Sequence, residues 1–208
     1  MNRLHTVDHP LIEDCLGYLR ARETDVADFR RYARLLTQLL CFEATRDLAL
    51  RDDHVETPLE RAPVRRLADQ VVLVPVLRSG LAMLETVGNL FPGAKVGFVG
   101  LERDEETAVA RGYYRKLPSP LAGSRVMILE PMLATGGSAC ATLEIVTEAG
   151  ATDVRLVSVV AAPEGVAEVE RRFPECSIYC AVLDRGLNGR KFILPGLGDF
   201  GDRYFGTA

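Results

Sequence analysis

Five apolar runs, rich in β-branched residues, follow one another along the chain. They span residues 71–76, 96–101, 126–129, 154–161 and 178–183. Segments with helical periodicity lie between several of them, including 81–90 and 139–149. Continuous apolar strands that alternate with helices are typical of a mostly parallel sheet covered on both faces. The pattern therefore predicts a doubly wound α/β fold, whose ligands bind where loops leave the carboxyl ends of the strands.

The chain before the first run has a different pattern. Residues 24–50 carry apolar side chains near helical spacing, which predicts one long amphipathic helix. Residues 51–70 are polar and charged and contain Pro58 and Pro63, which indicates an exposed arm or hairpin, with an ordinary surface loop as the alternative. Exposed apolar positions on the helix favour an oligomer over a monomer.

The tail, residues 184–203, contains five Gly and one Pro, which predicts a loop without strands or helices. A long Gly-rich loop in a compact domain is usually functional or disordered. Its apolar residues Phe192, Ile193, Leu194 and Leu197 favour order, so we expect a hood over the active site. The 208 residues fit one domain, 1–208, that includes arm and hood.

The segment 130–138 carries the clearest chemistry. A predicted buried strand stops at Glu130, and the chain then turns through small residues into the predicted helix 139–149. Backbone N–H groups of such a turn converge on one point, and the helix dipole adds positive potential there. Gly136 and Gly137 permit close approach of a phosphate, and Thr135 and Ser138 offer hydroxyl donors.

This phosphate loop is not a Walker A motif, because no Lys precedes Ser138. Glu130 stands at the end of the strand instead, where we expect it to face solvent and accept hydrogen bonds from vicinal hydroxyls of a sugar. An acid beside a phosphate cradle predicts a ribose-5-phosphate site.

Five segments, in order, resemble those of the uracil phosphoribosyltransferases, a family of type I phosphoribosyltransferases. They are residues 75–80, 113–118, 130–138, 161–165 and 195–203, and the likeness extends from His9 to Thr207. The resemblance implies transfer of a phosphoribosyl group from 5-phosphoribosyl-1-pyrophosphate (PRPP) to uracil, with UMP and pyrophosphate as products. It also implies a dimer-contacting arm, Mg²⁺ carried by PRPP and not by protein ligands, and, in part of the family, activation by GTP.

The same resemblance assigns residues to roles. It places PRPP against Arg78, Arg103, Glu130, Pro131, Met132, Leu133, Ala134, Thr135, Gly136, Gly137, Ser138 and Asp199. It makes Asp199, Arg103 and Glu130 the catalytic groups, and it places the base against Ile193, Gly198, Asp199 and Phe200. A transition state like an oxocarbenium ion needs electrostatic stabilisation and positioning more than a covalent nucleophile.

Two arginines have competing interpretations. Arg78 follows a buried strand in a turn that leads into a helix, and its guanidinium fork suits pyrophosphate; pairing with a surface acid is the alternative. Arg103 opens a charged stretch that either closes over PRPP or is a solvated loop. Asp202 and Arg203, adjacent and of opposite charge, are expected to pair with each other.

Three departures from the family pattern leave the acceptor base open. Glu130 stands where the family usually has Asp, Phe200 where it has a small Ala, and Arg190 and Lys191 add two cations to the approach. We expect the Phe200 ring to point away from the base, into hood or core. A different base, or a catalytically weak nucleotide-binding regulator on the same fold, are the alternative functions.

Charge and composition argue against several classes of partner and site. A net charge of −4 argues against nonspecific binding of nucleic acid. The N-terminus lacks an apolar signal core, and no stretch approaches the roughly 18 apolar residues of a membrane span, so we expect a cytoplasmic protein. The five Cys are scattered, which favours burial as small hydrophobes over disulfides or a metal site.

Overall fold

A computed structural model describes residues 3–103 and 110–207. Within these residues, nine strands form the central sheet, in the order β1-β11-β10-β8-β4-β6-β7, with β5 beside β4 and β9 beside β10. Its strands are β1 Leu4–Thr6, β4 Gln70–Leu77, β5 Lys95–Val96, β6 Phe98–Arg103, β7 Ala110–Lys116, β8 Ser124–Leu129, β9 Met132–Leu133, β10 Asp153–Ala161 and β11 Ser177–Leu183. All pairs are parallel except β6 with β7.

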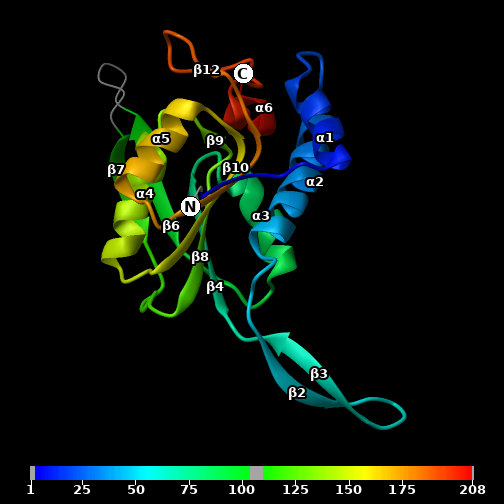
Figure 1. Cartoon of the computed structure of the whole chain (residues 1–208). Helices are drawn as coiled ribbons and strands as arrows, with labels where there is room; N and C mark the ends of the chain where they lie inside the picture. Colours follow the sequence, from blue (N-terminus) through cyan, green and yellow to red (C-terminus); the bar gives the residue numbers. More distant parts are fainter. Residues whose placement is uncertain (1–2, 104–109, 208) are drawn as a thin grey trace.

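Helices cover both faces of this sheet (Figure 1). One face packs against α1 Pro10–Arg20, α2 Val26–Ala44 and α3 Leu81–Leu90, and the other against α4 Gly137–Glu148 and α5 Pro163–Arg172. The sheet thus has a first core, on the side of α1, α2 and α3, and a second core, on the side of α4 and α5. In β4, Leu73 belongs to the first core and Val72 and Val74 to the second, because successive side chains of a strand alternate between faces. The predicted doubly wound α/β fold is therefore confirmed.

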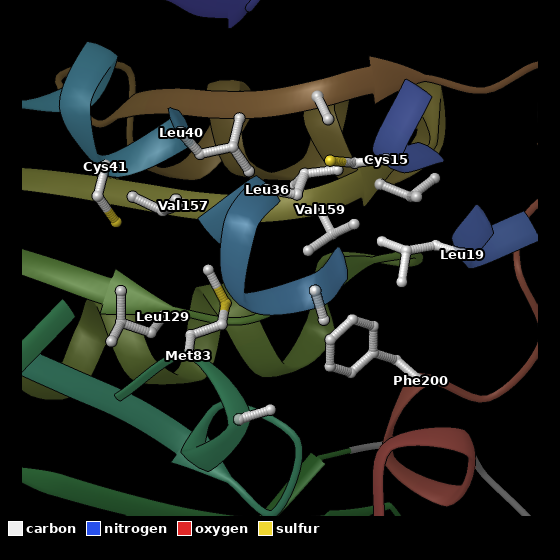
Figure 2. Packing of buried hydrophobic residues seen from close by; sticks show 14 of the residues in the cluster. Cys15, Leu19, Leu36, Leu40, Cys41, Met83, Leu129, Val157, Val159 and Phe200 are labelled. Atoms are coloured by element: carbon white, nitrogen blue, oxygen red, sulfur yellow. The ribbon is translucent and has the colours of Figure 1, made fainter. Parts of the chain in front are cut away.

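The first core is closed by long apolar side chains of the N-terminal helices. Figure 2 shows Leu36 and Leu40 of α2 lying over Val157 of β10, with Met83 of α3 beside Leu129 of β8. All these side chains are completely buried. This packing fixes the helices against the sheet and thereby fixes the loops that leave its carboxyl edge.

The predicted long helix is shorter than expected. Asp25 caps α2 at its N-terminus, accepting a hydrogen bond from the backbone N–H of Asp28 at 2.9 Å, and the helix ends at Ala44. Thr45 turns its hydroxyl back onto the carbonyl of Cys41 at 2.6 Å, and Leu50 already begins a strand. The apolar residues between Ala44 and Leu50 have helical spacing in the sequence, but they are not part of the helix.

The polar segment that follows is a hairpin. β2 Leu50–Glu56 and β3 Arg61–Leu67 pair antiparallel and extend away from the body of the molecule (Figure 1). The hairpin form of the arm is therefore confirmed.

Two further predictions are corrected. The run at 96–101 is divided between β5 and β6 at Gly97, where a Cβ would lie 2.6 Å from the Leu117 side chain. The tail is more regular than its composition indicated: β12 Gly186–Leu187 pairs with β13 Ile193–Leu194, and α6 spans Phe200–Phe205. Burial of apolar tail residues overrides the loop propensity of its glycines.

The predicted burial of the five cysteines is confirmed, and none of them forms a disulfide. No helix in the described part of the chain is long and apolar enough to cross a membrane.

Candidate functional site

A cavity of about 470 Å³ lies where the loops after β4 and β8 and the strand β6 meet the tail. It is lined by Arg78, Ser79, Leu101, Met132, Ala134, Ser138, Lys191, Phe192, Ile193, Gly198, Asp199, Phe200 and Gly201. Segments far apart in sequence, each predicted to carry part of the site, therefore meet in one cavity. A larger hollow between β1, α1 and α2 contains none of the predicted site residues.

The phosphate loop is held between β8 and α4. Gly136 precedes the first residue of α4 with φ 81°, and a Cβ there would lie 2.9 Å from the carbonyl oxygen of Gly165. Only glycine fits this close and left-handed position. The first turn of α4 therefore begins beside the cavity, and its N-cap residue, Gly136, has no side chain to cap it, as an anion site requires.

Residues 130–138 contribute unequally to the cavity. Met132, Ala134 and Ser138 line it, whereas the others of the segment are not among its lining residues: Glu130, Pro131, Leu133, Thr135, Gly136 and Gly137. Leu133 is buried, and the Thr135 hydroxyl accepts from the Gly137 N–H at 3.4 Å.

Glu130 differs from its expected setting. It is only 9% exposed, so the expectation of a solvent-facing acid is wrong. Its backbone N–H donates to the Val157 carbonyl at 3.1 Å, which continues the contact between β8 and β10 past the end of β8. The carboxylate is therefore held at the sheet edge by a fixed backbone.

Cys140 lies one turn into α4, behind the phosphate loop. Burial raises the pKa of its thiol to about 11, with smaller contributions from neighbouring charges. The thiol is therefore neutral at pH 7 and is not poised as a nucleophile.

Arg78 lines the cavity and also has an acidic partner. Its Nη2 lies 3.1 Å from Oδ1 of Asp202 in α6, and the Leu77–Arg78 peptide is cis. The Thr207 hydroxyl donates to the same Asp202 oxygen at 2.7 Å. Both interpretations of Arg78 thus have a structural counterpart, and an anion in the cavity would compete with Asp202 for the guanidinium.

The expected pairing of Asp202 with Arg203 is wrong. Arg203 donates instead to the backbone carbonyls of Leu197 at 2.8 Å, Ala21 at 2.6 Å and Leu19. Adjacent residues at the start of a helix project in different directions, so neighbouring charges in sequence need not meet.

Asp199 lines the cavity and begins α6. One carboxylate oxygen accepts from the Asp202 N–H at 2.9 Å, which makes Asp199 the N-cap of the helix. This structural role orients the side chain at the cavity wall. Arg103 is the last residue of β6, but its side chain and the charged loop 104–109 lie outside the described residues.

Phe200 is 1% exposed and points into the first core. Its ring centroid lies 5.3 Å from that of Phe29 in α2, edge to face, and 5.9 Å from that of Tyr204. Figure 2 shows the Phe200 ring among the buried side chains of this core. The expectation that the ring turns into hood or core is confirmed, and its partners come from the core. Ile193 and Gly198 line the cavity with it, as does Lys191, whereas Arg190 does not.

Sequence reasoning missed the residues that hold the tail in place. Asp184 follows β11 directly and is buried, a position at a strand's carboxyl end that could have been noticed. Arg20 ends α1, far from every recognisable motif, and carries no such signal. Glu164 of α5 accepts from the Leu187 N–H at 3.1 Å and so also supports the tail.

Comparisons with known proteins agree with this geometry. The family model for uracil phosphoribosyltransferase matches residues 6–207. Relatives named uracil phosphoribosyltransferase include one from Natranaerobius thermophilus, 44% identical over the whole of both chains. Another, from Acinetobacter baylyi, is 46% identical and covers 99% of this chain and 98% of its own.

Solved structures show the same relationship. The AQ2163 protein of Aquifex aeolicus superposes with a TM-score of 0.94 at 37% identity, covering 99% of each chain. A hypoxanthine-guanine phosphoribosyltransferase of Bacillus anthracis, 11% identical and covering 76% of this chain and 80% of its own, has a TM-score of 0.52 and shares the fold. The chain belongs to the uracil phosphoribosyltransferase family.

Proposed function

We propose that this protein is a uracil phosphoribosyltransferase, a pentosyltransferase that converts uracil and PRPP to UMP and pyrophosphate in pyrimidine salvage. The observation that carries the proposal is the single cavity shared by the phosphate loop, the Arg78 turn and the tail. Each segment has the chemistry for a different part of the two substrates. Full-length relatives with that name support the choice of base.

The N-terminal turn of α4 would hold the 5′-phosphate, because it has no side-chain cap and contributes Ser138 to the cavity lining. Arg78 would exchange Asp202 for pyrophosphate and stabilise the negative charge that grows on it as the glycosidic bond breaks. Glu130 would accept from the ribose hydroxyls, and Asp199 and Arg103 would act beside the anomeric carbon.

Uracil would be recognised by backbone groups near Ile193, Gly198 and Phe200. The Phe200 ring does not obstruct this, since it is buried against Phe29. A base read by main-chain groups needs a rigid loop more than particular side chains.

The proposal includes Mg²⁺, which would enter the site bound to PRPP. Phosphate-bound Mg²⁺ retains several waters and needs few protein ligands. The carboxylate of Asp199 at the cavity wall is of the oxygen type that this ion prefers. The ion would neutralise charge on pyrophosphate.

Three further parts of the proposal concern the protein's surroundings. Five free, buried cysteines suit the reducing cytoplasm. The projecting arm suits a homodimer or higher homo-oligomer. Activation by GTP stays a prediction, to be checked by adding GTP to the assay below.

Release of pyrophosphate from PRPP and Mg²⁺, measured with a panel of free bases, tests the function. We expect turnover with uracil and little with cytosine, hypoxanthine or adenine. Lys191 at the cavity favours one alternative, a pyrimidine that carries an anionic substituent, so the panel includes a uracil carboxylate. If the protein prefers that base, the carboxylated pyrimidine and not uracil is the acceptor. If it binds PRPP but turns over no base, it is a regulator.

A further inference from the structure

The turn of the tail at residues 194–197, here called the tail turn, is hydrogen-bonded to a partly buried ion pair. Arg20 at the end of α1 donates to both carboxylate oxygens of Asp184, at 2.7 and 3.0 Å. Asp184 accepts from the Gly196 N–H at 2.9 Å, and Arg20 donates to the Gly196 carbonyl, also at 2.9 Å. Both backbone polar groups of one residue are thus held by the two members of one pair.

Burial makes this arrangement specific. The Asp184 side chain is 4% exposed, and its backbone N–H is bonded to the Ala161 carbonyl at 2.8 Å, so the carboxylate is fixed to the sheet edge. Hydrogen bonds to a charged group are stronger than neutral ones, and a bidentate guanidinium also fixes orientation. Arg20 therefore connects the end of α1 to the tail turn through a rigid partner.

Arg203 supports the same turn from the other side. It bonds the Leu197 carbonyl at 2.8 Å and the Ala21 carbonyl at 2.6 Å, and its guanidinium lies 4.5 Å from the centroid of the Phe29 ring. Gly196 and Leu197 are thus both linked by hydrogen bonds to the C-terminal end of α1, Gly196 through Arg20 and Leu197 through Arg203. The cavity residues Ile193 and Gly198 flank this fixed turn on its two sides.

We infer that Arg20 and Asp184 form a positioning pair that sets the backbone of the base-reading segment and so determines which base is accepted. The inference rests on the proposed function, because it assigns base recognition to residues 193–200. Neither side chain lines the cavity, so the pair acts through Gly196. The phosphate loop, the Arg78 turn and Asp199, which caps α6, are held by other contacts, so PRPP binding should be independent of the pair.

Steady-state kinetics of Arg20→Lys and Asp184→Asn test this division. Each variant keeps a polar group but loses the bidentate bond, and we expect the KM for uracil to rise about ten- to a hundredfold. The KM for PRPP should stay within about twofold, and discrimination between uracil and its ring-substituted analogues should weaken. Arg46→Lys is the matched control, because Arg46 makes a bidentate pair with Glu43 at 2.6 and 3.0 Å outside the cavity.

Amide hydrogen exchange supplies a readout that does not depend on activity. In the wild type the Gly196 N–H should be protected by its buried bond to Asp184, and in Arg20→Lys its exchange should accelerate more than that of β8 and β10. An equal rise of both KM values, or unchanged Gly196 exchange, would overturn the inference. A wild-type protein inactive on every base would instead refute the proposed function.

Discussion

The carboxylate of Glu130 is the group that the proposed function assigns to the ribose hydroxyls. It stands at the end of β8, largely buried and with its backbone bonded to β10. We expect Glu130→Ala to lower kcat about ten- to a hundredfold, since each hydrogen bond to a charged group contributes about 1.5–3 kcal/mol. Glu130→Asp should retain most activity. Near-normal turnover of the Ala variant, with an unchanged far-UV circular dichroism spectrum, would place the ribose site elsewhere.

The Arg78 guanidinium can pair either with Asp202, as in this structure, or with an anion bound in the cavity. Arg78→Lys keeps the charge but loses the planar fork, so we expect a higher KM for PRPP and little change in the KM for uracil. Initial rates with each substrate varied in turn measure the difference. Unaltered PRPP kinetics would leave Arg78 with only its ion pair to Asp202 as a role.

Phe200 is a core residue within a functional segment. Because its ring is completely enclosed beside Phe29, we expect Phe200→Ala to destabilise the protein by about 3–5 kcal/mol through loss of burial and formation of a cavity. A lower Tm in calorimetry would show this. Improved uracil turnover in the folded variant would contradict the assignment, since the ring would then have obstructed the base.

At the scale of elements, the end of α2 is tied to the sheet by charge. Asp47, beyond the last turn of α2, contacts Arg155 of β10 at 2.6 Å and Arg125 of β8 at 3.0 Å. The hydrogen bond from Arg155 is the main cause that lowers the pKa of Asp47 from 3.8 to about 2. The two arginines are mostly buried, and Asp47 compensates their charge together with Asp69 and Asp153.

This pair should give the protein a measurable acid sensitivity. Since the folded-state pKa is depressed, the stabilisation is present above about pH 4 and is lost as pH falls toward 2. Asp47 is 61% exposed, so solvent screening limits the effect to about 1 kcal/mol.

Denaturant unfolding of Asp47→Asn at several pH values measures this contribution. The variant should be less stable than the wild type at pH 7, and the difference should shrink below pH 4. Asp52→Asn, in the arm and 94% exposed, should match the wild type throughout. A constant difference across this range would show that ionisation of Asp47 is not the cause.

At the scale of the whole molecule, the arm is the feature that a single chain does not explain. Leu59 at its tip is 95% exposed, and Leu50 and Leu67 at its base are also exposed. We expect the chain to sediment as an oligomer and a variant with residues 51–66 replaced by a short flexible linker to sediment as a monomer. Oligomers of equal size for both proteins would contradict a role of the arm in assembly.

The sequence alone determined the parts of this protein that depend on neighbouring residues. Alternating apolar runs and helical segments specified the doubly wound sheet, because burial on two faces imposes that pattern locally. The bounds of α3 were predicted correctly, and so was the turn at Gly136, whose geometry requires glycine. The phosphate loop was recognisable for the same reason, since its function lies in the backbone of consecutive residues.

Tertiary structure decided which distant residues meet. Arg78 finds Asp202 across 124 residues, and Arg20 finds Gly196 across 176. It also turned Phe200 toward Phe29 and buried Glu130 at the sheet edge. No local pattern contains such pairs, because they arise only when the strand order brings the end of α1, the turn after β4 and the tail to one edge of the sheet.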